Sequence, residues 1–291
     1  MVDPRRPRPA ATFVECEMQL NISNHPLDQA TALVTNEDGS LTGQTDAAYA
    51  NMVDPFGGIT AAAIMNALLM HPARLGDPVS LTINFAASIA YSAYRFDAEP
   101  VRTNRSTQHW SIKLSQGEEL TTSVTAVFAL RKVTWSTTKI VMRAVPARAD
   151  VPRSGLGNTD RAWFDNNEMR FVRGYLLDLS EADDERDSVS VLWVRDESPR
   201  QFDFVSLTSI CDSSAPRIMV RRLKRVPIGT VSMTIHFYAD LAQLIAQSAR
   251  FLLGSARASH FGCGYHDQMA MVWCDNSVLL ATSHQIVYFK E

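Results

Sequence analysis

The pair Gly57-Gly58 opens a stretch, residues 57–70, whose start could take part in chemistry. The first N–H groups of a helix have no partner inside the helix, and glycine lets another group approach that backbone closely. A helix start of this kind can bind an anion or the oxyanion of an acyl-transfer intermediate. The same glycines would also serve close packing of a helix against a sheet. Both interpretations of Gly57 and Gly58 remain open from the sequence.

A second segment with chemical potential is Cys211-Asp212-Ser213-Ser214-Ala215-Pro216. A carboxylate such as Asp212 can act as a general base, or orient a water molecule, if an apolar pocket raises its pKa toward neutral pH. An Asp before two serines is also a common cap of a short helix. The sequence therefore offers a catalytic and a structural role for Asp212.

Other familiar chemistries have no motif in this chain. There is no GxSxG elbow, no HExxH pair, and no cluster of His and Cys with metal-ligand spacing. Four cysteines without CxxC spacing favour reduced thiols in a cytoplasmic protein. We therefore expect no metal and no redox cofactor.

Charge and hydropathy exclude two classes of partner. The net charge is −3, the sequence pI is near 6.2, and no stripe of Lys and Arg alternates with aromatic residues, so nucleic-acid binding is not expected. No apolar run reaches the length of a membrane span, so no membrane partner is expected. The Arg- and Pro-rich residues 1–11 are predicted to form a loose tail.

The elements that would position these residues are one enclosed helix and a series of strands. Residues 57–70 are small or apolar on almost every side, which predicts a buried helix. Four strand-like segments follow, with turn residues between them. They cover residues 79–87, 93–102, 108–115 and 120–132, and further strands are predicted at residues 13–21 and 189–195.

The second half of the chain repeats the first. Ser80-Leu-Thr-Ile-Asn-Phe-Ala-Ala87 matches Ser232-Met-Thr-Ile-His-Phe-Tyr-Ala239 at an offset of 152 residues. Leu120–Val127 matches Leu280–Val287 at an offset of 160. Two matches in the same order indicate a duplicated domain. Residues 202–218 replace the central helix in the second half, where Pro216 interrupts the helix.

One helix wrapped by an antiparallel sheet, given twice, resembles the double hot-dog fold of the type II acyl-CoA thioesterases and their thioesterase-like relatives. The resemblance rests on Asp54–Thr60, Ser80–Phe85, Ile210–Pro216, Gly229–Phe237 and Leu279–Ile286. It implies an α+β fold with an N-terminal hot-dog over residues 12–138, a linker over 139–187 and a C-terminal hot-dog over 188–291.

The resemblance also implies a site. In that family an Asp, a Thr and a Gln of the second hot-dog hold and activate the hydrolytic water, and the motifs place them on Asp212, Thr230 and Gln285. A slipped register would instead place the hydroxyl on Ser232 or Thr234, and Thr234 is retained as a substrate contact together with Gly57 and Gly58. Strand alternation puts Gln285 on one face with Ser283 and Val287, which is either a core face or an exposed one.

The implied activity is hydrolysis of acyl-CoA thioesters in fatty acid metabolism, with coenzyme A present only as part of the small-molecule substrate. Arg102, Arg105 and Lys113 could meet its phosphates, although charges beside a hairpin turn are usually solvated. The resemblance also implies a homo-oligomer. A dehydratase, isomerase or cyclising enzyme that pairs Asp212 with a histidine, and a non-catalytic acyl-binding protein, are the alternatives.

Overall fold

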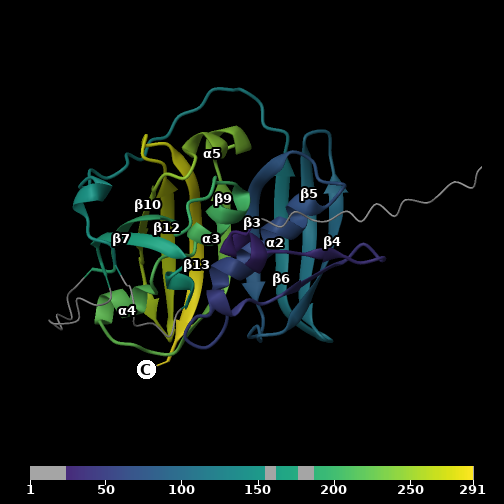
Figure 1. The fold of residues 1–291 in the computed structure, drawn as a ribbon, viewed down its shortest axis with the longest axis horizontal. Coiled ribbons are helices and arrows are strands. Elements are labelled where there is room, and N and C mark those ends of the chain that lie inside the picture. Colours follow the sequence, from purple (N-terminus) through teal and green to yellow (C-terminus); the bar gives the residue numbers. More distant parts are fainter. Residues whose placement is uncertain (1–23, 155–161, 176–186, 291) are drawn as a thin grey trace, which may run out of the picture.

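The computed structural model describes residues 24–154, 162–175 and 187–290, and Figure 1 shows two halves side by side with helices α2 and α3 between them. The predicted tail at 1–11 and the predicted strand at 13–21 lie outside the described residues. The helices are α1 (Pro26–Ala30), α2 (Gly57–Met70), α3 (Phe204–Ile210), α4 (Arg217–Arg222) and α5 (Leu241–Gln247), with short 3-10 turns at Ala47–Tyr49, Arg148–Asp150 and Ala162–Phe164. The strands are β1 (Val34–Thr35), β2 (Leu41–Gln44), β3 (Asp77–Phe85), β4 (Ala93–Thr103), β5 (Thr107–Gln116), β6 (Glu119–Ala129), β7 (Asn167–Arg173), β8 (Ser190–Asp196), β9 (Ile228–Phe237), β10 (Leu252–Arg257), β11 (Phe261–Gly262), β12 (Tyr265–Trp273) and β13 (Leu279–Phe289).

The described strands form one continuous antiparallel sheet that runs through both halves. Its order is β1-β2-β4-β5-β6-β3-β9-β13-β12-β10-β8-β7, with β11 paired to β12. The four strands predicted after the buried helix are confirmed as β3 to β6. Of these four, only β4, β5 and β6 pair in chain order, because β3 pairs with β6 and with β9. The structure also shows that the predicted linker contributes a strand, because β7 pairs with β8 at the sheet edge.

The two halves meet at the repeated strands β3 and β9. Ser80 stands opposite His236, Asn84 opposite Ser232, and Thr82 opposite Thr234. Thr82 and Thr234 are equivalent in the repeat, and their hydroxyl oxygens lie 3.1 Å apart. A pseudo-two-fold axis therefore passes between them. The first repeat match is confirmed, and it marks the strand pair that joins the two hot-dogs.

The second repeat match is wrong by one residue. Thr125 stands opposite Thr82, and His284 stands opposite Thr234. These two partners are 159 residues apart, whereas the sequence match gave 160. Because side chains alternate between faces, the match at 160 pairs buried positions of one strand with outward positions of the other. The correct offset makes Ala126 the counterpart of Gln285.

The two central helices differ in length for a local reason. Helix α2 runs uninterrupted to Met70 and is buried along nearly its whole length, as predicted. Helix α3 begins with an Asp203 capping box and ends at Ile210. Pro216 then serves as the N-cap of α4, since proline cannot continue a helix. Asp212 consequently lies in the turn between α3 and α4.

Among the described residues, no helix has the length and apolar character needed to span a bilayer.

Candidate active site

Asp212 lies where the end of α3 meets the start of α2, between the two halves of the molecule. Its carboxylate accepts a hydrogen bond from the Gln285 side chain, with 2.7 Å between Nε2 and Oδ1. It accepts another from the backbone N–H of Gly58. Helix α2 of the N-terminal half and the last strand of the C-terminal half, β13, therefore both hold this carboxylate.

The environment of Asp212 changes its acidity. Burial raises the pKa of this carboxyl to about 7, and the hydrogen bonds from Gln285 and Gly58 lower it only in part. Removal of a carboxylate from water disfavours its charged form, so the protonated state gains. The group is therefore poised to exchange a proton near neutral pH, which suits a general base.

The glycine pair shapes the approach of this carboxylate. A Cβ atom on Gly57 would lie 2.8 Å from Asp212 Oδ2, and one on Gly58 would lie 2.7 Å from the carbonyl oxygen of Ser209. Both positions therefore need glycine for close contact between α2 and the end of α3. The Gly58 N–H that the sequence offered to a substrate oxygen is directed at Asp212 instead.

Gln285 lies on the inner face of β13. It is 2% exposed, as the core-face interpretation required, and it shares this face with the buried residues Ser283 and Val287. The Ser283 hydroxyl donates to the carbonyl oxygen of Cys211 at 2.9 Å. This bond satisfies a carbonyl at the end of α3 and ties the turn that carries Asp212 to the strand that carries Gln285.

A β-bulge decides which hydroxyl of β9 faces the site. Thr230 stands opposite Val287 and Ser232 opposite Ile286, so Val231 is the extra residue. Thr230 therefore shares the inner face with Val287 and Gln285. Thr234 stands opposite the outward His284 and contacts Thr82, so the structure does not bring Thr234 to this group. The same alternation turns Ser232 outward.

Histidines are absent from the contacts of Asp212. Within the described residues its hydrogen-bond partners are Gln285 and Gly58. His284 is outward and lies 3.8 Å from Asp267, and His109 and His236 are exposed. The acid–base pair that a dehydratase-like site would need is therefore not formed in the described part of the chain.

The pseudo-two-fold axis identifies the counterparts of the three site residues in the N-terminal half. The register of the sheet matches Gln285 with Ala126 and Thr230 with Pro78. Phe56 and Ile64 of the first half match Phe202 and Ile210 at an offset of 146, and the same offset aligns Asn66 with Asp212. The N-terminal half thus has Asn66 in place of the carboxylate of Asp212, Pro78 in place of the hydroxyl of Thr230 and Ala126 in place of the amide of Gln285.

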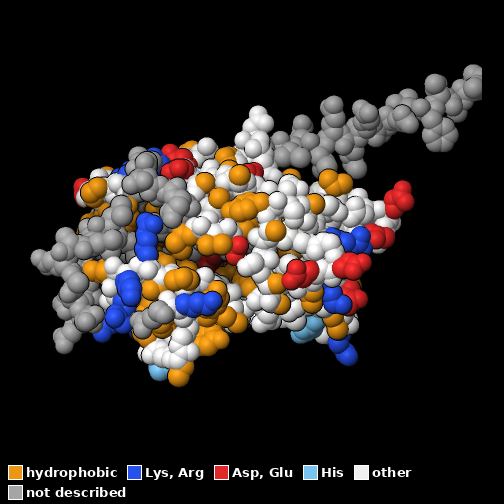
Figure 2. Space-filling model, turned by 90° about the horizontal axis from the view of Figure 1, so that it is seen from below, with side chains coloured by type: hydrophobic (Ala, Val, Ile, Leu, Met, Phe, Trp, Pro, Cys, Tyr) orange, Lys and Arg blue, Asp and Glu red, His pale blue; other side chains and the backbone are white. Residues whose placement is uncertain are grey.

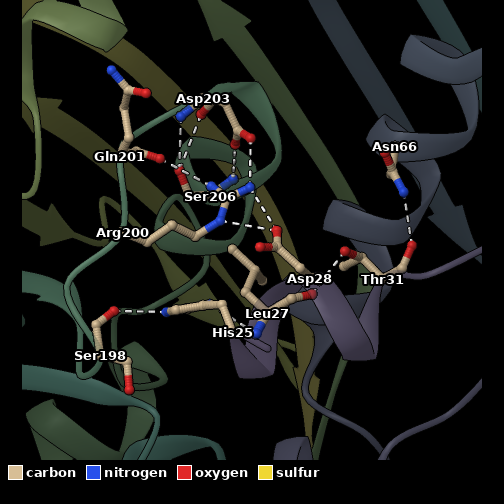
Figure 3. A network of polar contacts seen from close by, with 10 residues as sticks. All are labelled: His25, Leu27, Asp28, Thr31, Asn66, Ser198, Arg200, Gln201, Asp203 and Ser206. Carbon is tan, nitrogen blue, oxygen red and sulfur yellow. Dashed lines mark hydrogen bonds and ion pairs between the residues drawn. The ribbon is translucent and has the colours of Figure 1, made fainter. Parts of the chain in front are cut away.

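Figure 3 shows that ion pairs fasten the opposite end of α3. Arg200 bonds Asp28 of α1 and Asp203, the N-cap of α3, each at 2.7 Å. The Asn66 amide donates to the carbonyl oxygen of Thr31 at 2.8 Å. This end is therefore an internally paired structural contact, while the end at Asp212 keeps a carboxylate without a cationic partner among the described residues.

Two buried polar residues were not identified from the sequence, of which one faces Gln285 and the other contacts that neighbour. Gln268 of β12 stands directly opposite Gln285 and is 2% exposed, and Arg217 at the start of α4 is 0% exposed. The Arg217 Nε donates to Gln268 Oε1 at 2.9 Å. The alternation of Gln268 with Ala270 and Val272 along β12 is a signal that could have found Gln268. No local pattern indicates that Arg217 is buried.

Two protein-family models match this chain, one in each half. The acyl-CoA thioesterase N-terminal domain matches residues 47–129, and the acyl-CoA thioesterase C-terminal domain matches residues 143–289. The chain belongs to the acyl-CoA thioesterase family. Its fold is the double hot-dog that the sequence predicted.

Solved structures give the same fold. A hot-dog-fold protein of unknown function from Alicyclobacillus acidocaldarius is 43% identical, with a TM-score of 0.87 over 92% of this chain and 99% of that one. A putative thioesterase II from Thermobifida fusca is 16% identical, with a TM-score of 0.78 over 92% and 98%. Acyl-CoA thioesterase II TesB2 from Mycobacterium marinum is 18% identical, with a TM-score of 0.73 over 91% and 98%. Among curated proteins, no sequence matches this chain.

Proposed function

We propose that this chain hydrolyses acyl-CoA thioesters at a site built from Asp212, Thr230 and Gln285. The observation that carries the proposal is the Asp212 carboxylate, which is held by an amide and a helix-start N–H and has a pKa near 7. Family membership supports a thioester as the substrate. One functional site per chain follows from the Asn, Pro and Ala at the equivalent positions of the N-terminal half.

In this mechanism Asp212 takes a proton from water while the water oxygen adds to the thioester carbonyl carbon. Gln285 and Thr230 hold the water and keep the carboxylate in position. The carbon–sulfur bond then breaks, and the leaving thiolate receives the proton from Asp212. The products are a carboxylic acid and a free thiol, and no metal or redox step is needed.

The charge distribution supports a phosphate-bearing thiol carrier such as coenzyme A. The end of α4 and the residues that follow it carry Arg221, Arg222, Lys224 and Arg225. Lys and Arg side chains gather over the C-terminal half in Figure 2, at the left of the view. Arg102, Arg105 and Lys113 lie instead on or beside β4 and β5 of the N-terminal half, so the α4 region is the better place for the phosphates.

The test is release of free thiol from short, medium, long and aromatic acyl-CoAs by the wild type and by Asp212→Asn. We expect turnover of one class and a fall of about a hundredfold or more in the variant, because the general base is lost. Circular dichroism of both proteins controls for folding. Absence of turnover with every thioester, or an unchanged rate in Asp212→Asn, would overturn the proposal.

A further inference from the structure

Gln268 is a buried amide beside the proposed site whose orientation the fold determines. A guanidinium group only donates hydrogen bonds. The contact of 2.9 Å between Arg217 Nε and Gln268 Oε1 therefore requires the carbonyl end of the amide to face Arg217. The Nε2 end must point away from Arg217, and it forms no hydrogen bond with another residue that the structure describes.

Arg217 is itself fixed very firmly. Besides Gln268 it donates to the Ala215, Ser188 and Ala256 carbonyl oxygens and to the Ser190 hydroxyl. Every acceptor is neutral, so the buried guanidinium has no carboxylate partner among the described residues. Burial of a cation without a carboxylate partner costs free energy. One of the Arg217 donors nevertheless bonds Gln268 and so determines the direction of its amide.

Gln268 and Gln285 form a facing pair on the inner face of the sheet. They are opposite each other in the β12–β13 register, and each is 2% exposed. Cβ atoms at directly opposite positions are about 5 Å apart. The Gln285 Nε2 donates to Asp212, whereas the Gln268 Nε2 forms no hydrogen bond with another described residue.

We propose that Gln268 is a further catalytic residue, whose Nε2–H donates to the substrate carbonyl oxygen as it becomes an oxyanion, and that Arg217 is the residue that positions it. This inference rests on the proposed thioester hydrolysis. Gln268 would supply the donor to the substrate oxygen that the Gly58 N–H does not supply, because the Gly58 N–H is directed at Asp212. Preorganised donors of this kind stabilise charge that develops in the transition state.

The sharpest variant is Gln268→Glu. A glutamate still accepts from Arg217 and gives the buried cation an acid partner, so the fold should be retained. It has no N–H, so we expect kcat to fall about a hundredfold on the high-pH plateau, with KM within about threefold. The plateau matters because a new carboxylate near Asp212 would also raise the pKa of Asp212. A kcat of Gln268→Glu that reaches within about threefold of wild type on the high-pH plateau would overturn the proposal.

The matched control is Gln108→Glu. Gln108 is also 2% exposed, but both ends of its amide are bonded inside the N-terminal half, to Leu75, Ala73, Thr103 and Trp110. We expect a lower melting temperature and an unchanged rate per folded molecule. Gln268→Met, a neutral residue without a donor, should lower kcat as Gln268→Glu does, and normal turnover in Gln268→Met would also overturn the proposal.

The positioning role of Arg217 is tested by a double-variant cycle. Arg217→Lys should lower kcat in the wild-type background but have little effect in the Gln268→Glu background, because the donor that it positions is already absent. Equal losses in both backgrounds would show a general structural role. If Asp212→Asn abolishes turnover while Gln268→Glu does not, this inference fails alone. If the wild type hydrolyses no thioester, the proposed function and this inference fail together.

Discussion

The raised pKa of Asp212 makes a quantitative prediction about stability. In the folded chain burial raises this pKa from 3.8 to about 7. Between these values the folded state binds a proton that the unfolded state has released, so stability falls as pH rises. The full difference is about 4 kcal/mol at most, and it is complete above the folded pKa. The site residue therefore destabilises the fold at the pH at which it would work.

Asp212→Asn removes this titration. The free energy of unfolding of the variant minus that of the wild type should rise by about 1 kcal/mol per pH unit between pH 4.5 and 7, and level off above about pH 7.5. Asparagine places an NH₂ group toward one of the two donors, Gln285 or Gly58, but that cost is independent of pH and cancels from the slope.

The measurement is urea unfolding of both proteins at half-unit steps from pH 4.5 to 8.5, followed by circular dichroism and by tryptophan fluorescence. Agreement between the two signals checks two-state behaviour. A stability difference that stays flat across this range would show that the pKa of Asp212 is ordinary in the folded state, and it would refute the reasoning behind its role as a base.

Further predictions concern the rate and the fit of the site. The logarithm of kcat/KM should rise with slope one below the Asp212 pKa and reach half its plateau value near pH 7, because the base must be ionised; a rate that is independent of pH from 5 to 9 would contradict this. Thr230→Val should lower kcat about tenfold or more. Thr234→Val, on the opposite face of the same strand, should leave kcat unchanged and remove only the contact with Thr82. Steady-state kinetics of the two variants tests this, and equal effects on kcat would show that Thr230 does not supply the hydroxyl of the site. Gly57→Ala should lower both activity and melting temperature, because its Cβ would lie 2.8 Å from Asp212 Oδ2; wild-type kinetics in this variant would show that the contact is loose.

Local patterns predicted the elements of this fold well. The helix at residues 57–70, the four strands that follow it and the duplication are all recognisable from the sequence, because burial and alternation leave a direct trace in residue types. The enclosed helix and the β3–β9 match were placed correctly. The match between β6 and β13 failed by one residue, because a short run of identities along a strand does not determine which face its side chains occupy.

The sequence by itself determined that a carboxylate would lie near a break in the second central helix, since Pro216 cannot occupy the interior of a continuous helix. Only the tertiary structure decided what that carboxylate meets. The hydrogen bond from Gly58 to Asp212 joins residues more than 150 positions apart. The bulge at Val231 turns Thr230, and not Thr234, toward the site. Arg217 is buried because its α4 side chain contacts the three strands β8, β10 and β12. Such contacts arise from packing between distant segments, and distance along the chain carries no information about them.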